Sequence, residues 1–139
     1  MGGLRKLRRD QDRKYASSIV KMASRYGRKL SEVLLEFAEP LTATARTAED
    51  FRKDIELAVL VWNLSLMPEE ERSAFLKEAI DPSPGQKASL PPEIKPYIQM
   101  LLDRKQARFP DDNRFVVEHQ LSGGPRDANL VVAYEIANR

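Results

Sequence analysis

The stretch FRKDIELAVLVWNLSLM, from Phe51 to Met67, decides the fold. In its second half apolar side chains occupy almost every position, so they point in all directions around a helical turn. A helix of that kind has to be buried on most of its sides. We therefore expect residues 51–67 to form a buried central helix, with Trp62 in the core.

Helix-end signals lie on either side of this segment. Thr47, with Asp50 three positions later, resembles a capping box with Asp in place of Glu. Pro68 precedes three glutamates, which is typical of the first position of a second helix, expected from Pro68 to Ile80. The apolar residues of this second helix, Phe75 among them, are spaced so that it can fold back on the first.

One further helix is predicted before the central one, from Glu32 to about Ala45, with Ser31 as its N-cap. Pro40 lies inside this segment. Because proline removes one ladder hydrogen bond and clashes with the preceding turn, it has to kink the helix or end it near Phe37. The apolar spacing continues past the proline, which favours the kink.

After a proline-rich loop over residues 81–93, we expect a helix from about Pro92 to Arg108, with Pro96 either in its first turn or at its true start. The helical spacing places Tyr97 on the apolar face and Lys105 on the exposed face.

Beyond Phe109 the apolar residues alternate, which indicates strands at residues 114–121 and 129–137 with a loop over 122–127. One face of the first strand is predicted to carry Phe115, Val117, His119 and Leu121. Two strands alone leave both sheet edges unpaired, so a homodimer could form through an edge of the hairpin.

These segments predict an α+β fold with about five helices around the central helix, followed by a C-terminal two-stranded antiparallel β-hairpin. The length of 139 residues suits one such domain, over residues 30–139, after a basic segment, residues 1–29. The absence of cysteine excludes disulfides and thiolate metal sites and agrees with a reducing cytoplasm, where we expect the protein. Without a long apolar run, neither a secretory signal nor membrane insertion is expected.

The basic segment is expected to form an amphipathic helix that is partly mobile. Ten cations against Asp10 and Asp12 give it a charge of +8, and the total of +2 leaves −6 for the rest of the chain. The ten candidate contacts to nucleic acid or to an acidic partner are Arg5, Lys6, Arg8, Arg9, Arg13, Lys14, Lys21, Arg25, Arg28 and Lys29. Contacts to phosphates would be tolerant of sequence, since no reading motif accompanies them. The alternative is a solvated face, or one neutralised by the acidic remainder or a partner.

Catalytic chemistry has little support in the sequence. His119 is the only histidine, and no nucleophile can be placed beside it from spacing, so we predict no catalytic, metal or cofactor-binding residues. Asn63 lies among apolar neighbours and needs hydrogen-bond partners. It could line a small pocket, for which Trp62 and His119 are the other candidates. Alternatively, it caps a neighbouring loop or meets the carbonyls that Pro40 frees in a kinked helix. An enzyme would gain support from a cleft that combines His119, Asn63 and a carboxylate.

The order LSEVLLEFAEPL, ELAVLVWNLSLMPEEER and IQMLLDRKQARFPDDNRFVVEHQL resembles small uncharacterised bacterial α+β proteins in which helices precede a terminal hairpin. The resemblance spans about residues 30–137 and implies no particular activity or site. We expect a non-enzymatic interaction or regulatory protein that binds another protein or itself. A nucleic-acid-binding accessory protein that uses the basic segment is the alternative.

Overall fold

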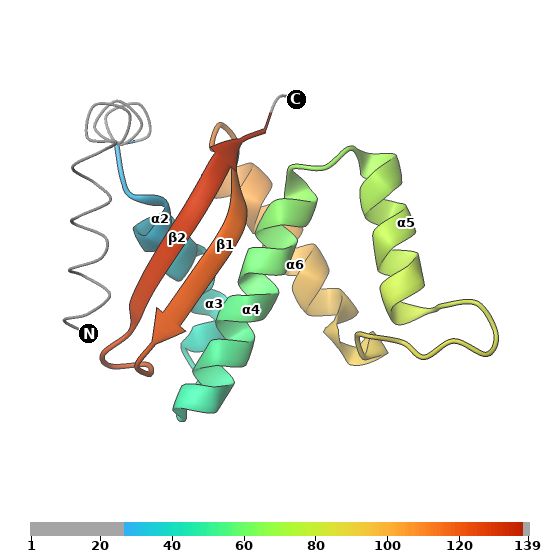
Figure 1. Cartoon of the computed structure of the whole chain (residues 1–139), viewed down its shortest axis with the longest axis horizontal. Coiled ribbons are helices and arrows are strands. Elements are labelled where there is room, and N and C mark those ends of the chain that lie inside the picture. The colour runs from blue at the N-terminus through green and yellow to red at the C-terminus, as the bar shows by residue number, and fades with distance from the viewer. Residues whose placement is uncertain (1–26, 138–139) are drawn as a thin grey trace.

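The computed structural model describes residues 27–137, which form five α-helices, one short 3-10 helix and a two-stranded antiparallel sheet, in an α+β arrangement. In chain order these are α2 (Leu30–Phe37), α3 (Glu39–Thr42), α4 (Ala48–Ser65), α5 (Glu69–Ile80), η1 (Pro92–Ile94), α6 (Lys95–Arg108), β1 (Arg114–Ser122) and β2 (Asn129–Ile136). Figure 1 shows α4 between the hairpin and α5. The expected order of helices and then a hairpin is confirmed.

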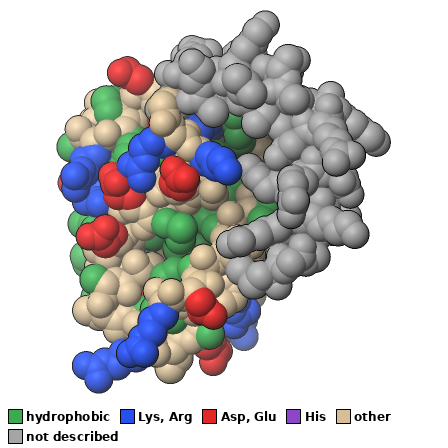
Figure 2. Space-filling model, turned by 90° about the vertical axis from the view of Figure 1, so that its left-hand side faces the viewer, with side chains coloured by type: hydrophobic (Ala, Val, Ile, Leu, Met, Phe, Trp, Pro, Cys, Tyr) green, Lys and Arg blue, Asp and Glu red, His purple; other side chains and the backbone are tan. Residues whose placement is uncertain are grey.

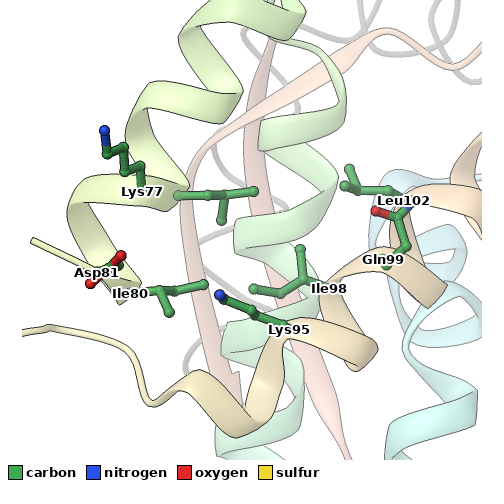
Figure 3. A pocket seen from close by; sticks show the side chains of 8 residues that line it. Lys77, Ile80, Asp81, Lys95, Ile98, Gln99 and Leu102 are labelled. Carbon is green, nitrogen blue, oxygen red and sulfur yellow. The ribbon is translucent and has the colours of Figure 1, made fainter.

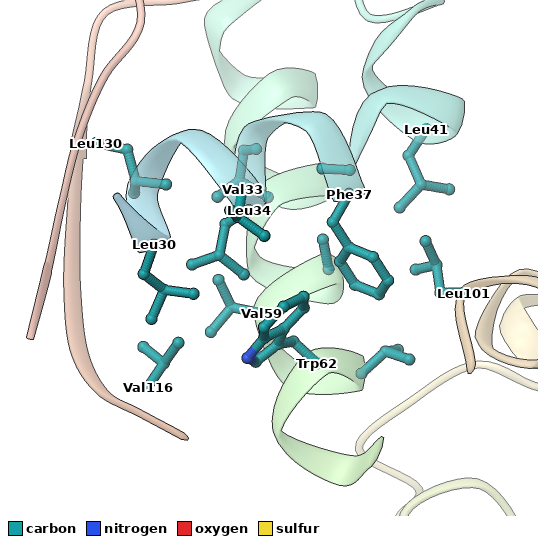
Figure 4. Packing of buried hydrophobic residues seen from close by; sticks show 14 of the residues in the cluster. Leu30, Val33, Leu34, Phe37, Leu41, Val59, Trp62, Leu101, Val116 and Leu130 are labelled. Carbon is teal, nitrogen blue, oxygen red and sulfur yellow. The ribbon is translucent and has the colours of Figure 1, made fainter. Parts of the chain in front are cut away.

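Helix α4 begins at the cap that its sequence predicts. The Thr47 side chain accepts a hydrogen bond from the Asp50 backbone N–H at 3.0 Å, which caps the helix. Seven of its residues are buried, and Trp62 is fully enclosed. Figure 4 shows Trp62 facing Phe37, with the two ring centroids 5.2 Å apart in an edge-to-face arrangement.

The core lies between α2, α4, α6 and the inner face of the hairpin (Figure 4). Leu30 and Leu34 of α2 meet Val116 and Leu130 of the two strands there, and Leu101 enters from α6. Packing against helices is what an isolated hairpin needs in order to be stable in water.

Pro40 divides its helix in two. Helix α2 ends at Phe37, Ala38 links the two segments, and α3 starts at Glu39 with Pro40 in its first turn. The expected kinked continuous helix is therefore wrong, and so is the Ser31 cap, since α2 already begins at Leu30. Proline lacks the N–H that would continue the ladder, and the first turn of a new helix is where that loss has no effect.

Helix α5 is less buried than expected. Only Ala79 is buried, and Phe75 keeps 42% of its surface exposed, so the helix does not fold its apolar face fully onto α4. Pro68 precedes the helix as its N-cap residue and is not its first residue.

Two expectations for α6 are wrong, although Pro96 does lie in its first turn. Tyr97 is 52% exposed, whereas Lys105 is 5% exposed. Lys105 follows Ile98 and Leu101 at helical spacing, so it lies on the same face of the helix. Because that face packs against the core, the Lys105 side chain is buried with it.

A β-bulge at Val117 separates the two halves of β1. Val116 pairs with Tyr134 and Glu118 with Ala133, so Val117 is the extra residue and is 59% exposed. The prediction that Phe115, Val117, His119 and Leu121 share one face is therefore wrong before the bulge. There the buried residues are Arg114 and Val116. His119 and Leu121 do share a half-buried face beyond it.

Candidate interaction groove

A groove of about 450 Å³ lies between α5 and α6 (Figure 3). Leu76 and Ile80 line it from α5, and Ile98 and Leu102 line it from α6. Each pair is four residues apart, which places its two members on one helical face. Two apolar stripes therefore face one another across a space that no described side chain fills.

Charged groups stand at the rim of this groove. Lys77, Asp81 and Lys95 are part of its lining, and none of them forms an ion pair within the described residues. In Figure 3 the Lys95 side chain reaches toward Ile80, whereas Lys77 and Asp81 point away from α6. Of these three charged side chains, Lys95 is thus the one directed across the groove.

Helix α5 is connected to its neighbours in the chain by a short turn before it and a hydrogen-bonded loop after it. It follows the turn at Met67 and Pro68, and the loop after it returns to hydrogen-bond the Ala79 carbonyl through the backbone N–H groups of Ser89 and Leu90, at 2.9 and 3.0 Å. These contacts tie the loop to the end of α5, and Leu76 and Ile80 on the same helix are half-buried.

Trp62 and Asn63 belong to neither of the two hollows formed by described residues, and their side chains join α4 to β1. The Trp62 Nε1–H donates to the Arg114 carbonyl at 2.7 Å. Asn63 donates through Nδ2 to the Val116 carbonyl at 2.9 Å and accepts the Val116 N–H at Oδ1 at 2.8 Å. Asn63 therefore bonds to the edge of β1 as a neighbouring strand would. Of the alternatives expected for it, the carbonyls near Pro40 are not its partners in these two bonds.

His119 lies elsewhere, in a pocket of about 220 Å³ beside Glu56 and Arg52. Asn63 does not belong to this pocket, so the combination that would support an enzyme is not assembled. Within residues 27–137 no group of three or more potential metal ligands comes together.

A buried charged pair joins the end of α6 to β1, and sequence patterns did not reveal it. Arg114 and Asp112, both buried, share two side-chain hydrogen bonds of 2.8 and 2.6 Å. Burial opposes the charge on Arg114, but hydrogen bonding and attraction to Asp112 raise its pKa overall. In the sequence, Asp111 and Asp112 have the pattern of turn residues. The one signal for the ion pair between Asp112 and Arg114 is the position of Arg114 on an inner face of the strand.

Lys105 is enclosed in the same region. Its Nζ donates to the Phe109 carbonyl at 2.6 Å and lies 4.8 Å from the centroid of the Trp62 ring. Burial lowers the pKa of Lys105, while Asp112 and Asp111 act in the opposite direction. We assign this cluster a structural role, because its charges are already matched by groups within the fold.

Of the ten cations of the basic segment, only Arg28 and Lys29 fall within the described residues. Arg28 pairs with Glu36 at 2.7 Å, and this hydrogen bond lowers the pKa of Glu36. The other eight, and the helix expected there, lie outside the described residues. On the face shown in Figure 2, cationic and acidic side chains of the described residues alternate and form no single basic patch.

Comparison with protein-family models, with curated proteins and with solved structures finds no match. Among the described helices, none is long and apolar enough to cross a membrane. Inferences about function therefore depend on the geometry of the groove and on the charge of the chain.

Proposed function

We propose that the chain is a non-enzymatic protein-interaction module that binds an amphipathic helix of a partner protein in the groove between α5 and α6. The observation that carries this proposal is the groove itself, an unfilled space of about 450 Å³ with an apolar stripe from each helix. Helix-in-groove recognition uses such a surface, into which one partner helix inserts apolar residues at spacings of three and four.

The charge of Lys95 indicates which kind of partner helix the groove can bind. Lys95 has no ion-pair partner among the described residues and extends over the apolar floor (Figure 3). A carboxylate beside the apolar stripe of the partner would meet this ammonium, and a lysine there would be repelled. We therefore assign the groove to an acidic amphipathic helix.

A designed helical peptide tests this assignment. The probe is a fluorescein-labelled peptide with leucines at positions i, i+3, i+4 and i+7 and glutamates on the flanks, titrated with the protein by fluorescence anisotropy. Ile80→Glu and Lys95→Glu should each weaken binding at least about tenfold, which corresponds to roughly 1.4 kcal/mol. Lys87→Glu, in the exposed loop after α5, is the control with the same charge change and should have little effect.

The proposal fails if the peptide does not bind the wild-type protein, or if all three variants bind it equally. A peptide with lysines in place of the glutamates should bind more weakly, and equal binding would contradict the role of Lys95. Circular dichroism of each variant shows whether its helices are intact.

A second candidate, a sequence-tolerant nucleic-acid-binding protein, is favoured by the +8 charge of residues 1–29. Binding to a generic duplex and a generic single strand should weaken steeply with salt and be lost on deletion of residues 1–14. No binding at low salt would exclude this function. Under either proposal we place the protein in a bacterial cytoplasm, on the resemblance given above and on its lack of cysteine.

A further inference from the structure

The two edges of the hairpin differ in how they are closed. The outward backbone groups of β1 at Arg114 and Val116 are hydrogen-bonded by Trp62 and Asn63, and the bulge at Val117 interrupts the rest of the strand. Side chains of α4 therefore occupy the place of a third strand along that edge. Capping and bulges are the usual means by which proteins prevent pairing at an edge.

Among residues 27–137, no side chain caps the edge of β2 in this way. The Ala137 N–H donates to the Asn113 carbonyl, so the inward-facing residues of β2 are the odd-numbered ones, by the alternation of an antiparallel ladder. The N–H and C=O groups of Leu130, Val132 and Tyr134 then point away from β1. No hydrogen bond between these groups and another described residue is present.

The sequence of β2 is suited to pairing. NLVVAYEI contains no proline, glycine or lysine, no bulge, and one charged residue, Glu135. Apolar and β-branched strands of low charge associate readily when their edge is open. A row of backbone donors and acceptors that no described residue pairs is complementary to another β-strand.

From this edge we infer that two copies of the chain associate through β2, antiparallel about a two-fold axis at Val132, to form a four-stranded sheet. In this register Val132 faces its own copy, Leu130 faces Tyr134 of the other copy, and Val131 faces Ala133. Glu135 then lies opposite Asn129, so the one charged residue of the strand meets no like charge. A two-fold axis makes the edge complementary to itself and closes the assembly at two copies.

Engineered cysteines test both the pairing and its register, since the natural chain has none. Val131→Cys and Ala133→Cys proteins are oxidised separately and as an equal mixture with copper phenanthroline. Residues 131 and 133 of different copies would face one another as a close pair, with Cα atoms about 4.5 Å apart. We expect a cross-linked dimer in the mixture and far less of it in either protein alone.

Val132→Pro is the matched disruption. Its lost N–H is the outward one, so the β1 ladder is kept while the dimer is blocked, and circular dichroism verifies the fold. Light scattering of the wild type at tens of micromolar should give the mass of two chains, and that of Val132→Pro the mass of one. A wild-type monomer at this concentration, or equal cross-linking in all three samples, would overturn the inference. Pairing of the β2 edge with an extended peptide from another protein would not rescue it, because the inference concerns two copies of this chain.

Discussion

Asn63 shows how one side chain can substitute for a strand. Its amide satisfies both the N–H and the C=O of Val116, at 2.8 and 2.9 Å, from the middle of a helix. The sequence shows that Asn63 lies among apolar residues and therefore needs hydrogen-bond partners. Its partner, Val116, is 53 residues away along the chain. Spacing along the chain carries no information about such a contact.

Replacing Asn63 with Ala should lower the free energy of unfolding by about 2–3 kcal/mol, because both backbone groups of Val116 lose their partners. Urea denaturation measures the change. Gln99→Ala, which removes an exposed hydrogen bond to Asp103, is the control and should change stability little. A loss for Asn63→Ala no larger than that of the control would mean that water replaces the amide without penalty.

Lys105 should make stability depend on alkaline pH. Burial lowers its folded-state pKa below the ordinary 10.5, so between these two values the unfolded chain binds more protons than the folded one. The contribution of Lys105 to stability therefore rises with pH across this window. In denaturant titrations from neutral pH upward, the wild type should gain stability relative to Lys105→Met. A constant difference between wild type and Lys105→Met would contradict the lowered pKa.

At the scale of elements, α4 and α5 differ in how firmly the fold holds them. Seven residues of α4 are buried and only Ala79 of α5. Local opening requires less free energy where few apolar contacts are lost. Backbone amides of α5 should therefore exchange with deuterium much faster than those of α4 between Ile55 and Trp62. Equal protection of the two helices would show that α5 is packed as firmly as the core and that the groove is rigid.

Sequence patterns predicted most of these elements, and the failures have physical causes. Apolar period and end signals located α4, α6 and the hairpin, because burial and capping act locally along the chain. The bulge at Val117 left no mark in the alternation, since β-branched residues suit both faces of a strand. Lys105 was misplaced because a long side chain can lie on an apolar stripe once a carbonyl and a ring receive its ammonium.

The candidate groove was not predictable in the same way. Each apolar residue that lines it has the spacing of a core residue, and the sequence could not show that α5 and α6 leave a gap between them. What distinguishes Leu76 and Ile80 from core residues is the position of the proline-rich loop that holds the end of α5, which is a property of the tertiary structure.

For the whole molecule, the two proposed surfaces are separate. The hairpin and α5 lie on opposite sides of α4 (Figure 1), so pairing through β2 leaves both grooves of a dimer open. Such a dimer would hold two partner helices and gain avidity for a partner that carries two. Val132→Pro should therefore bind a single acidic helix as the wild type does, and bind a tandem peptide with two such helices more weakly. Loss of single-helix binding in this folded variant, by anisotropy, would mean that groove and edge are coupled.

The most direct measurement is the map of backbone amide shifts in ¹⁵N-labelled protein as the acidic amphipathic peptide is added. If the groove is the binding surface, shifts should concentrate on α5 and α6 around Leu76, Ile80, Lys95 and Gln99, and those of β2 should stay unchanged. Shifts confined to residues 1–29 or to the hairpin, or none at saturating peptide, would contradict the assignment of the groove.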